Sequence, residues 1–349
     1  MFEALLEAWD GEAAVVRYDA PTHTWMMVGI HSTVLGPGAG GTRMKVYAEP
    51  RDGLRDVLRL SSAMTRKNAV AGLPLGGGKG VLAVPAIAEG AARRELLLRY
   101  ADLVESLHGT YWTACDMNTS PADMDVIGER CRSVFGRTEA AGGSGSSAPS
   151  TALGVYHAIR AAVGFAFDDA SLAGRSVLIQ GVGAVGRILG EYLARDGARL
   201  ILTDVDDARA RAAADALGAE VVAAVDAIQT PCDVFSPCAT GGVLSAETIP
   251  RLRCRIVAGA ANNQLESAGD AERFAQHGIL YAPDYVVNAG GIIHLASLEM
   301  LEEDEAKRDA RVEGIAATLS EVLERAARDG ISTGTAAERM AAERLGGVA

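Results

Sequence analysis

Lys79 stands directly after three consecutive glycines in the stretch 72–80, GLPLGGGKG. Glycine allows backbone N–H groups to approach a bound anion, and a lysine beside them adds charge or exchanges a proton. A nucleotide-triphosphate loop follows the pattern G-x-x-x-x-G-K-[ST]. Leu73 and Gly80 occupy the positions of its first glycine and its hydroxyl residue. The stretch is therefore not such a loop, and Lys79 is a candidate for chemistry on a small substrate.

Two further residues have types that suit acid–base chemistry beside Lys79. Lys67 lies earlier, near the end of a helix predicted over 52–70, and Asp116 follows an apolar strand in YWTACDMNT. Two lysines that face one pocket would lower each other's pKa, as would burial, so that one becomes a base and the other binds a carboxylate. Spacing alone leaves plainer interpretations open: a solvated Lys67, a structural glycine turn and a helix-capping Asp116.

A second glycine motif, QGVGAVG, follows the short apolar run SVLIQ and opens a predicted helix. It is the G-x-G-x-x-G pattern of dinucleotide-binding folds, in which the glycines permit a tight turn, close approach of the pyrophosphate and close helix packing. Asp204 ends the next predicted strand, where a carboxylate accepts ribose hydroxyls and repels a 2′-phosphate. We therefore expect NAD rather than NADP. The predicted cofactor residues here are Gly181, Gly183, Ala184, Val185, Gly186 and Asp204.

The elements that must position these residues form an α/β pattern of 349 residues, a length that suggests two domains. Strands are expected within 13–34, a glycine-dense loop at 36–44, and helices at 52–70 and 91–108. The Gly/Ser/Pro-rich segment 140–150 marks a boundary or flexible linker.

From residue 176 on, short apolar runs alternate with helices, which indicates a parallel, doubly wound sheet. We predict a catalytic, oligomerising domain at 1–137, a Rossmann-like NAD domain at 138–325, and helices at 326–349 that pack back on the first domain.

Composition narrows the class of partner. The net charge of −12 argues against nucleic acid and anionic membranes as partners. Five cysteines without C-x-x-C spacing indicate reduced thiols, with neither a disulfide framework nor a metal site. The start, MFEALLEAWDGE, lacks a positive segment, and no apolar run is long enough to span a bilayer. We expect a cytoplasmic protein.

The segments GPGAGGTRM, MTRKNAVAGLPLGGGKG, YWTACDMNTSPADMD, QGVGAVG, VAGAANNQL and YAPDYVVNAGGIIHL together resemble the Glu/Leu/Phe/Val amino-acid dehydrogenases over nearly the whole chain. The resemblance implies a catalytic domain and a Rossmann-like domain with a cleft between them, assembled as a homo-oligomer. It also implies NAD-dependent, reversible oxidative deamination of an L-amino acid to a 2-oxo acid and ammonia.

By position within these motifs, the resemblance assigns a role to each candidate. Lys67 binds the substrate carboxylate, with the backbone at Gly40 and Gly41 nearby. Hydride leaves Cα for the nicotinamide, neutral Lys79 activates the attacking water, and Asp116 exchanges a proton with the departing nitrogen. The residues placed around the nicotinamide and the substrate are Thr151, Asn262 and Asn288.

The resemblance also bears on the substrate. Lys45 has the wrong offset to hold a side-chain carboxylate, so apolar substrates are favoured over glutamate. Small Ala39, Leu295 and the segments GGSGSSAPST and TPCDVFSPCA resemble phenylalanine enzymes. Ile292 departs from them, and the motif TACD is closer to leucine enzymes. We take phenylalanine first and leucine or valine as the alternative, because a few methyl groups change binding by only about 1–3 kcal/mol. The predicted pocket residues are Ala39, Ala114, Ile292 and Leu295.

Two rival functions are weighed against the dehydrogenase. A non-catalytic NAD-binding regulator would not need Lys67, Lys79 and Asp116 together. A 2-hydroxyacid dehydrogenase would need a His/Arg pair, and none of the six histidines has a matching context. His294, within GGIIHL, is interpreted as a packed residue rather than a base.

Overall fold

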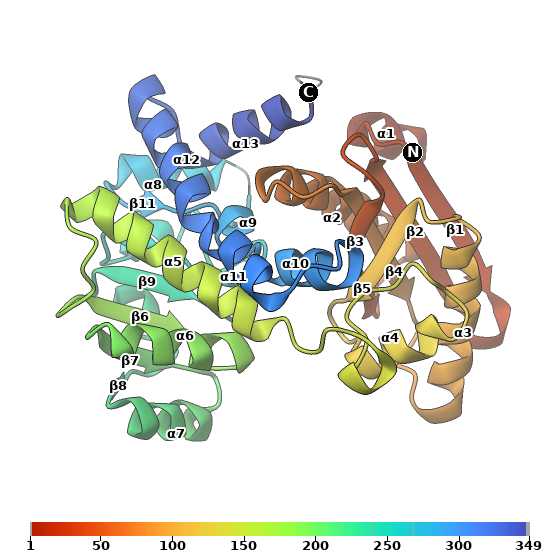
Figure 1. Cartoon of the computed structure of the whole chain (residues 1–349), viewed down its shortest axis with the longest axis horizontal. Helices are drawn as coiled ribbons and strands as arrows, with labels where there is room; N and C mark the ends of the chain where they lie inside the picture. The colour runs from red at the N-terminus through yellow and green to blue at the C-terminus, as the bar shows by residue number, and fades with distance from the viewer. Residues whose placement is uncertain (1, 240, 268, 347–349) are drawn as a thin grey trace. The chain divides into compact units, whose positions relative to one another are not determined.

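A computed structural model describes residues 2–239, 241–267 and 269–346. The chain divides into two compact units (Figure 1). Unit 1 comprises Met1–Ser146, Leu298–Glu302 and Ala341–Ala349, and unit 2 comprises Ser147–Ser297 and Glu303–Met340. The expected two-domain α/β architecture is confirmed.

Unit 1 is built on a five-stranded mixed sheet in the order β1-β2-β4-β3-β5. β2 pairs antiparallel with both β1 and β4, whereas β3 pairs in parallel with both β4 and β5. Its strands are β1 (Ala13–Asp19), β2 (Thr24–Ser32), β3 (Gly38–Lys45), β4 (Gly76–Ala83) and β5 (Tyr111–Cys115). The central strands β4 and β3 are therefore supported on both edges.

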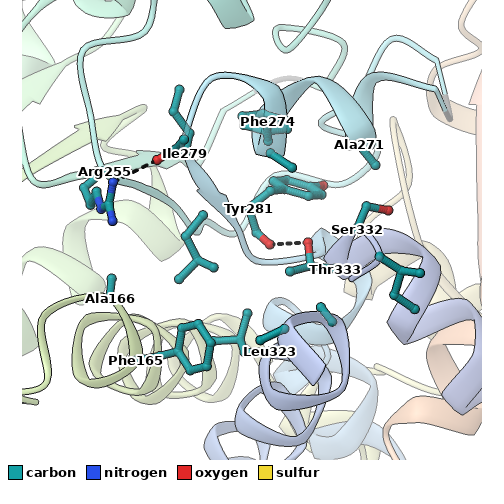
Figure 2. A pocket seen from close by; sticks show the side chains of 16 residues that line it. Phe165, Ala166, Arg255, Ala271, Phe274, Ile279, Tyr281, Leu323, Ser332 and Thr333 are labelled. Atoms are coloured by element: carbon teal, nitrogen blue, oxygen red, sulfur yellow. Dashed lines mark hydrogen bonds between the residues drawn. The ribbon is translucent and has the colours of Figure 1, made fainter. Parts of the chain in front are cut away.

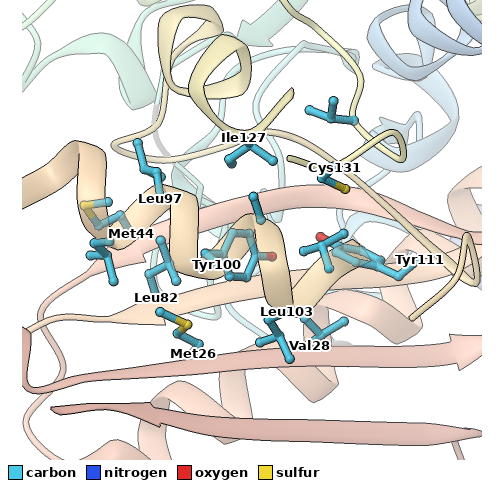
Figure 3. Close-up of a cluster of buried hydrophobic side chains, with 14 of the residues drawn as sticks. Met26, Val28, Met44, Leu82, Leu97, Tyr100, Leu103, Tyr111, Ile127 and Cys131 are labelled. Carbon is cyan, nitrogen blue, oxygen red and sulfur yellow. The ribbon is translucent and has the colours of Figure 1, made fainter. Parts of the chain in front are cut away.

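Helices of unit 1 pack on this sheet to form two apolar clusters. Val81 of β4 joins Leu54, Val57 and Leu58 of helix α2 in one cluster. The larger cluster brings sheet residues such as Met26 together with helices α3 and α4, and Figure 3 shows its side chains. The helices of this unit before the boundary are α1 (Phe2–Trp9), α2 (Pro50–Val70), α3 (Gly90–Glu105) and α4 (Pro121–Gly128).

Both glycine-dense segments, expected as loops or turns, are instead strands for most of their length. Residues 38–45 form β3, and residues 76–83 form β4, in which every residue is buried. A Cβ at Gly77 would lie 1.9 Å from Thr65 Oγ1 of α2, and one at Gly80 would lie 2.2 Å from Tyr100 OH of α3. The glycines therefore serve close packing of helices on the two faces of β4, rather than a turn.

Unit 2 contains a six-stranded sheet in the order β11-β10-β9-β6-β7-β8, parallel throughout. The two directions of winding away from β6 confirm the doubly wound, Rossmann-like prediction. The strands are β6 (Ser176–Gln180), β7 (Arg199–Thr203), β8 (Glu220–Val221), β9 (Val234–Pro237), β10 (Ile256–Val257) and β11 (Leu280–Tyr281).

Helices separate the strands of unit 2 and follow the last one. Helix α5 packs against α6, α10 and α12. The helices are α5 (Ala148–Phe167), α6 (Ala184–Arg195), α7 (Asp207–Leu217), α8 (Asp270–Gln276), α9 (Asp284–Val287), α10 (Gly290–Leu295), α11 (Glu305–Glu313), α12 (Ile315–Asp329) and α13 (Thr333–Arg344). A π-helical turn, Ala296–Met300, follows α10.

The contact-based limits of the units differ from the predicted domain limits of 1–137, 138–325 and 326–349. Residues 138–146 belong to unit 1, where Thr138 donates its N–H and hydroxyl to Asp125 (2.9 and 2.7 Å). Glu299 accepts the N–H groups of Gly136 (3.0 Å) and Ser144 (3.0 Å), so the Gly/Ser-rich segment is held by specific bonds. Arg344, at the end of α13, donates to Ala69 and Val70 carbonyls at the end of α2.

A cavity of about 310 Å³ lies in unit 2 beside β11 (Figure 2). Its walls come from α5, α8, α12 and the start of α13, and Phe165, Phe274, Tyr281 and Leu323 form its apolar surface. None of the residues selected from the sequence lines it. The cavity is therefore separate from the predicted chemistry.

Two kinds of feature are absent from the described part of the chain. No helix within it is long and apolar enough to cross a membrane. Nor does it hold a cluster of three or more His, Cys, Asp or Glu side chains arranged to bind a metal ion.

Candidate active site

Lys79 and Asp116 form an ion pair across the middle of the unit 1 sheet. Lys79 lies on β4 and Asp116 directly follows β5, with β3 between these two strands. Lys79 Nζ lies 3.2 Å from Asp116 Oδ1. The pair joins the two residues that the sequence analysis selected as base and acid/base.

A glycine on β3, Gly41, leaves room for the ion pair between Lys79 and Asp116. The pairing of Ala39 with Gly77 and of Thr42 with Gly80 puts Gly41 level with Lys79, and Gly41 pairs with Ala114 on the other side. A Cβ on Gly41 would lie 2.9 Å from Asp116 Cβ and 2.3 Å from the Cys115 carbonyl oxygen. A side chain at this position would therefore displace Asp116.

Hydrogen bonds below and beside β3 hold the site in place. Tyr111 donates its hydroxyl to the Gly40 carbonyl (2.7 Å). Thr119 donates to the Thr42 carbonyl (2.8 Å) and accepts the N–H of Asp116 (2.9 Å), so the loop that carries Asp116 is tied to β3. Because the Thr119 hydroxyl bonds to both segments, the backbone at Asp116 has little freedom to move, and the Asp116 carboxylate is preorganised.

Burial and neighbouring charges set the protonation of the pair. Burial is the largest influence on Lys79, whose side chain is 7% exposed, and it lowers the pKa of Lys79 below its ordinary value. Asp116 opposes this change, whereas Arg43 adds to it. Burial by itself raises the pKa of Asp116, but Lys79 and Arg43 outweigh it and hold this pKa at about 2. Asp116 is therefore ionised throughout the neutral range.

Arg43 and Asp56 are site residues that sequence reasoning missed. Arg43 Nε lies 2.8 Å from Asp116 Oδ2, and its Nη1 lies 2.9 Å from Asp56 Oδ2 of α2. Arg43 is the cation that lowers the pKa of Lys79 most, whereas the sequence led us to expect that effect from Lys67. One signal was available, because Arg43 follows Gly41 by two positions and strand residues two apart share a face.

Lys67 lies in the last turn of α2 and is half-buried. The same helix supplies Thr65 and Ser61, which approach the backbone at Gly77. Lys67 and Lys79 are thus carried by adjacent, closely packed elements. The assignment of the substrate carboxylate to Lys67 stays a prediction.

Unit 2 shows the separate geometric demands on the three motif glycines. Gly181 has a positive φ of 97°, which favours glycine. A Cβ on Gly186 would lie 2.0 Å from the Gly181 carbonyl oxygen, so α6 packs tightly on the turn. A Cβ on Gly183 would meet no protein atom within 4 Å. Gly183 is also the N-cap residue of α6. The space and the helix dipole suit a pyrophosphate that approaches the backbone.

Asp204 completes a site that fits a dinucleotide. It follows β7 and accepts the N–H groups of Val182 (3.0 Å) and Asp206 (3.0 Å). Burial alone would raise the pKa of Asp204, but these N–H groups and Arg209 lower it, so the residue is an ionised acceptor. Ala184 and Val185 form the first turn of α6, with Ala184 exposed. The residues present can therefore hold NAD by its pyrophosphate and a ribose.

The three residues predicted around the nicotinamide also lie in unit 2. Asn288 Nδ2 donates to Asn262 Oδ1 (3.0 Å) and to the Ala260 carbonyl (3.2 Å). Thr151 lies in the first turn of α5, and a Cβ on Gly291 would lie 3.0 Å from its Oγ1. The structure brings Asn262 and Asn288 together, and it places Thr151 beside the helix that follows Asn288.

The predicted pocket residues divide between the units. Ala39 and Ala114 lie on β3 and β5 of unit 1, whereas Ile292 and Leu295 lie on α10 of unit 2. Their common role as pocket walls stays a prediction. His294 is 4% exposed, and its Nδ1 lies 3.0 Å from Ser150 Oγ, in agreement with its interpretation as a packed residue.

Comparison with known proteins agrees with this geometry. Residues 23–133 match the dimerisation domain of Glu/Leu/Phe/Val dehydrogenases, and residues 202–347 match the Glutamate/Leucine/Phenylalanine/Valine dehydrogenase domain. A leucine dehydrogenase of Thermoactinomyces intermedius is 43% identical over 97% of this chain and 92% of its own length. A valine dehydrogenase of Streptomyces albus is 42% identical over 96% of this chain and 92% of its own.

Among solved structures, the L-tryptophan dehydrogenase from Nostoc punctiforme is similar with a TM-score of 0.85 and 37% identity, and the match covers 99% of both chains. Each of these similar proteins is named for an apolar amino acid. The Lys79–Asp116 pair, the dinucleotide site and the matches over nearly the whole chain lead to one conclusion. The chain belongs to the Glu/Leu/Phe/Val dehydrogenase family and is an NAD-dependent amino-acid dehydrogenase.

Proposed function

We propose that this enzyme oxidatively deaminates branched-chain L-amino acids, leucine and valine, to their 2-oxo acids and ammonia. The observation that carries the proposal is the identity of 39–43% to leucine and valine dehydrogenases over nearly the whole chain. The sequence analysis placed phenylalanine first, and these relatives favour its alternative. Phenylalanine is kept as the second candidate because Ala39, a predicted pocket residue on β3, is small.

The site residues support a division of labour. NAD, when bound, accepts the hydride from the substrate Cα. We assign water activation to neutral Lys79, because burial lowers its pKa and a neutral amine is the form that takes a proton. Asp116 is ionised and therefore takes a proton from the substrate nitrogen and returns it when ammonia leaves. Lys67 provides the cation for the substrate carboxylate.

We also propose that the enzyme is a homo-oligomer assembled through unit 1. The family match over residues 23–133 is described as a dimerisation domain, and it covers the other four strands of the unit 1 sheet, β2 to β5. Mass photometry of the purified protein tests this proposal. A single species at the mass of one 36.2 kDa chain would contradict it.

Absorbance of NADH, followed with a panel of the common L-amino acids, tests the substrate. We expect the highest kcat/KM for leucine and valine and a lower value for phenylalanine. Lys79→Ala should lose nearly all turnover, whereas Lys307→Ala, on the exposed side of α11, serves as the control for loss of a lysine. Activity on glutamate alone would contradict the proposal, and NAD binding without turnover of any amino acid would favour the non-catalytic regulator.

A further inference from the structure

Arg43 joins the catalytic pair to a second carboxylate that has no assigned role. Its side chain is 12% exposed. Arg43 on β3 pairs in register with Val81 on β4, and Val81 packs against α2, so both side chains lie on the α2 side of the sheet. The guanidinium uses Nε for Asp116 and Nη1 for Asp56, so one rigid planar group spans two carboxylates. Arginine is suited to this, since lysine has no two donors at a fixed separation.

The carboxylate of Asp56 is itself held from two other directions. Tyr47 donates its hydroxyl to Oδ2 (2.7 Å), and Arg59 donates to Oδ1 (2.9 Å). Burial and the neighbouring Asp56 raise the pKa of Tyr47, so its hydroxyl stays a donor. Asp56 is therefore a fixed anchor for Arg43 rather than a mobile surface carboxylate, with a side chain only 13% exposed.

The two oxygens of Asp116 are divided between the two cations. Oδ2 accepts from Arg43 at 2.8 Å, which leaves Oδ1 directed at Lys79 Nζ at 3.2 Å. The charges that act most on Lys79 thus come from three elements packed around it: Asp116 after β5, Arg43 on β3 and Asp56 on α2. Arg43 is the permanent cation of this group, because the pKa of a guanidinium lies above 12.

We propose that Arg43 is a positioning residue of the reaction, with Asp56 and Tyr47 as its anchor, and that it fixes the Asp116 carboxylate toward Lys79. This inference rests on the proposed roles of Lys79 and Asp116. Arg43 acts through Asp116, so its loss should reduce kcat far more than it changes KM.

The sign of the pH effect follows from the charges. Arg43 repels the protonated form of Lys79 and lowers its pKa, so Arg43→Gln should raise that pKa. The acidic limb of the kcat/KM profile, which requires neutral Lys79, should move to higher pH by about one unit. Arg43→Lys keeps the positive charge but cannot bond to Asp116 and Asp56 at once. The midpoint of the acidic limb should therefore stay near that of the unaltered enzyme, while kcat falls.

A second readout does not depend on turnover. Trace labelling with acetic anhydride modifies only neutral amines, and mass spectrometry of the Lys79 peptide over a pH series gives the midpoint for this lysine. We expect the same upward shift in Arg43→Gln. Asp56→Asn, which weakens the anchor, should lower kcat less than Arg43→Gln does and leave KM nearly unchanged.

Arg99→Gln is the matched control, because Arg99 forms a two-bond ion pair with buried Asp19 (2.6 and 3.0 Å) elsewhere in unit 1. The inference would be overturned if Arg43→Gln left both the midpoint of the kcat/KM profile and the labelling midpoint of Lys79 unchanged. An equal shift of these midpoints in Arg99→Gln would also overturn it. If the unaltered enzyme oxidises no amino acid, the proposed function fails, and the labelling experiment still decides whether Arg43 lowers the pKa of Lys79.

Discussion

Gly41 and Asp116 stand so close that β3 has no room for a side chain at Gly41, between Lys79 and Asp116. A Cβ on Gly41 would lie 2.9 Å from Asp116 Cβ, and the backbone carbonyl of Cys115 would be closer still. The ion pair between Lys79 and Asp116 therefore depends on a residue that contributes no functional group.

Gly41→Ala should reduce kcat at least about tenfold, because a displacement of about 1 Å at a reacting group costs that much or more. NAD binding, which uses residues of unit 2, should be unchanged, and NADH fluorescence measures it. Gly269→Ala is the control, since its Cβ would meet only Glu272 Oε2 at 3.9 Å. Full activity in Gly41→Ala would show that the site tolerates displacement of Asp116.

Gly183→Ala should leave stability nearly unchanged and weaken NAD binding at least tenfold. The space around the new Cβ is open in the structure, so no protein atom opposes it. The same methyl group would occupy the region in which a pyrophosphate approaches the helix N-terminus. Thermal unfolding and calorimetric titration with NAD measure the two effects.

Gly186→Ala provides the contrast to that variant. Its Cβ would lie 2.0 Å from the Gly181 carbonyl oxygen, so this substitution should lower the melting temperature as well as the affinity for NAD. Equal loss of stability in both variants would contradict the separate roles assigned to the two glycines.

Asp204→Asn should weaken NAD binding and narrow the preference for NAD over NADP. The amide retains the shape of the side chain but removes the charge that accepts ribose hydroxyls and repels a 2′-phosphate. Titration with both cofactors measures the ratio, and Asp215→Asn on the exposed side of α7 is the control. An unchanged ratio in Asp204→Asn would remove the ribose role from this residue.

Local features of the sequence were sufficient to predict the strand–turn–helix segment that carries Gly181, Gly183 and Gly186. The turn at Gly181, the helix cap at Gly183 and the close packing at Gly186 all arise within one short strand–turn–helix segment, so residue type and spacing specify them. The same holds for the long helix α2 and the alternation of strands and helices after residue 176, because both patterns repeat over many residues.

Only the tertiary structure decided which residues surround the proposed catalytic pair, Lys79 and Asp116. Arg43 meets Asp116 across 73 residues of sequence, and Asp56 reaches Arg43 from a different element. The strand character of the glycine runs was equally hidden, because it depends on helices and tyrosines that press on both faces of β4. Glycine is intrinsically a poor strand former, and packing from distant segments overrides that local preference.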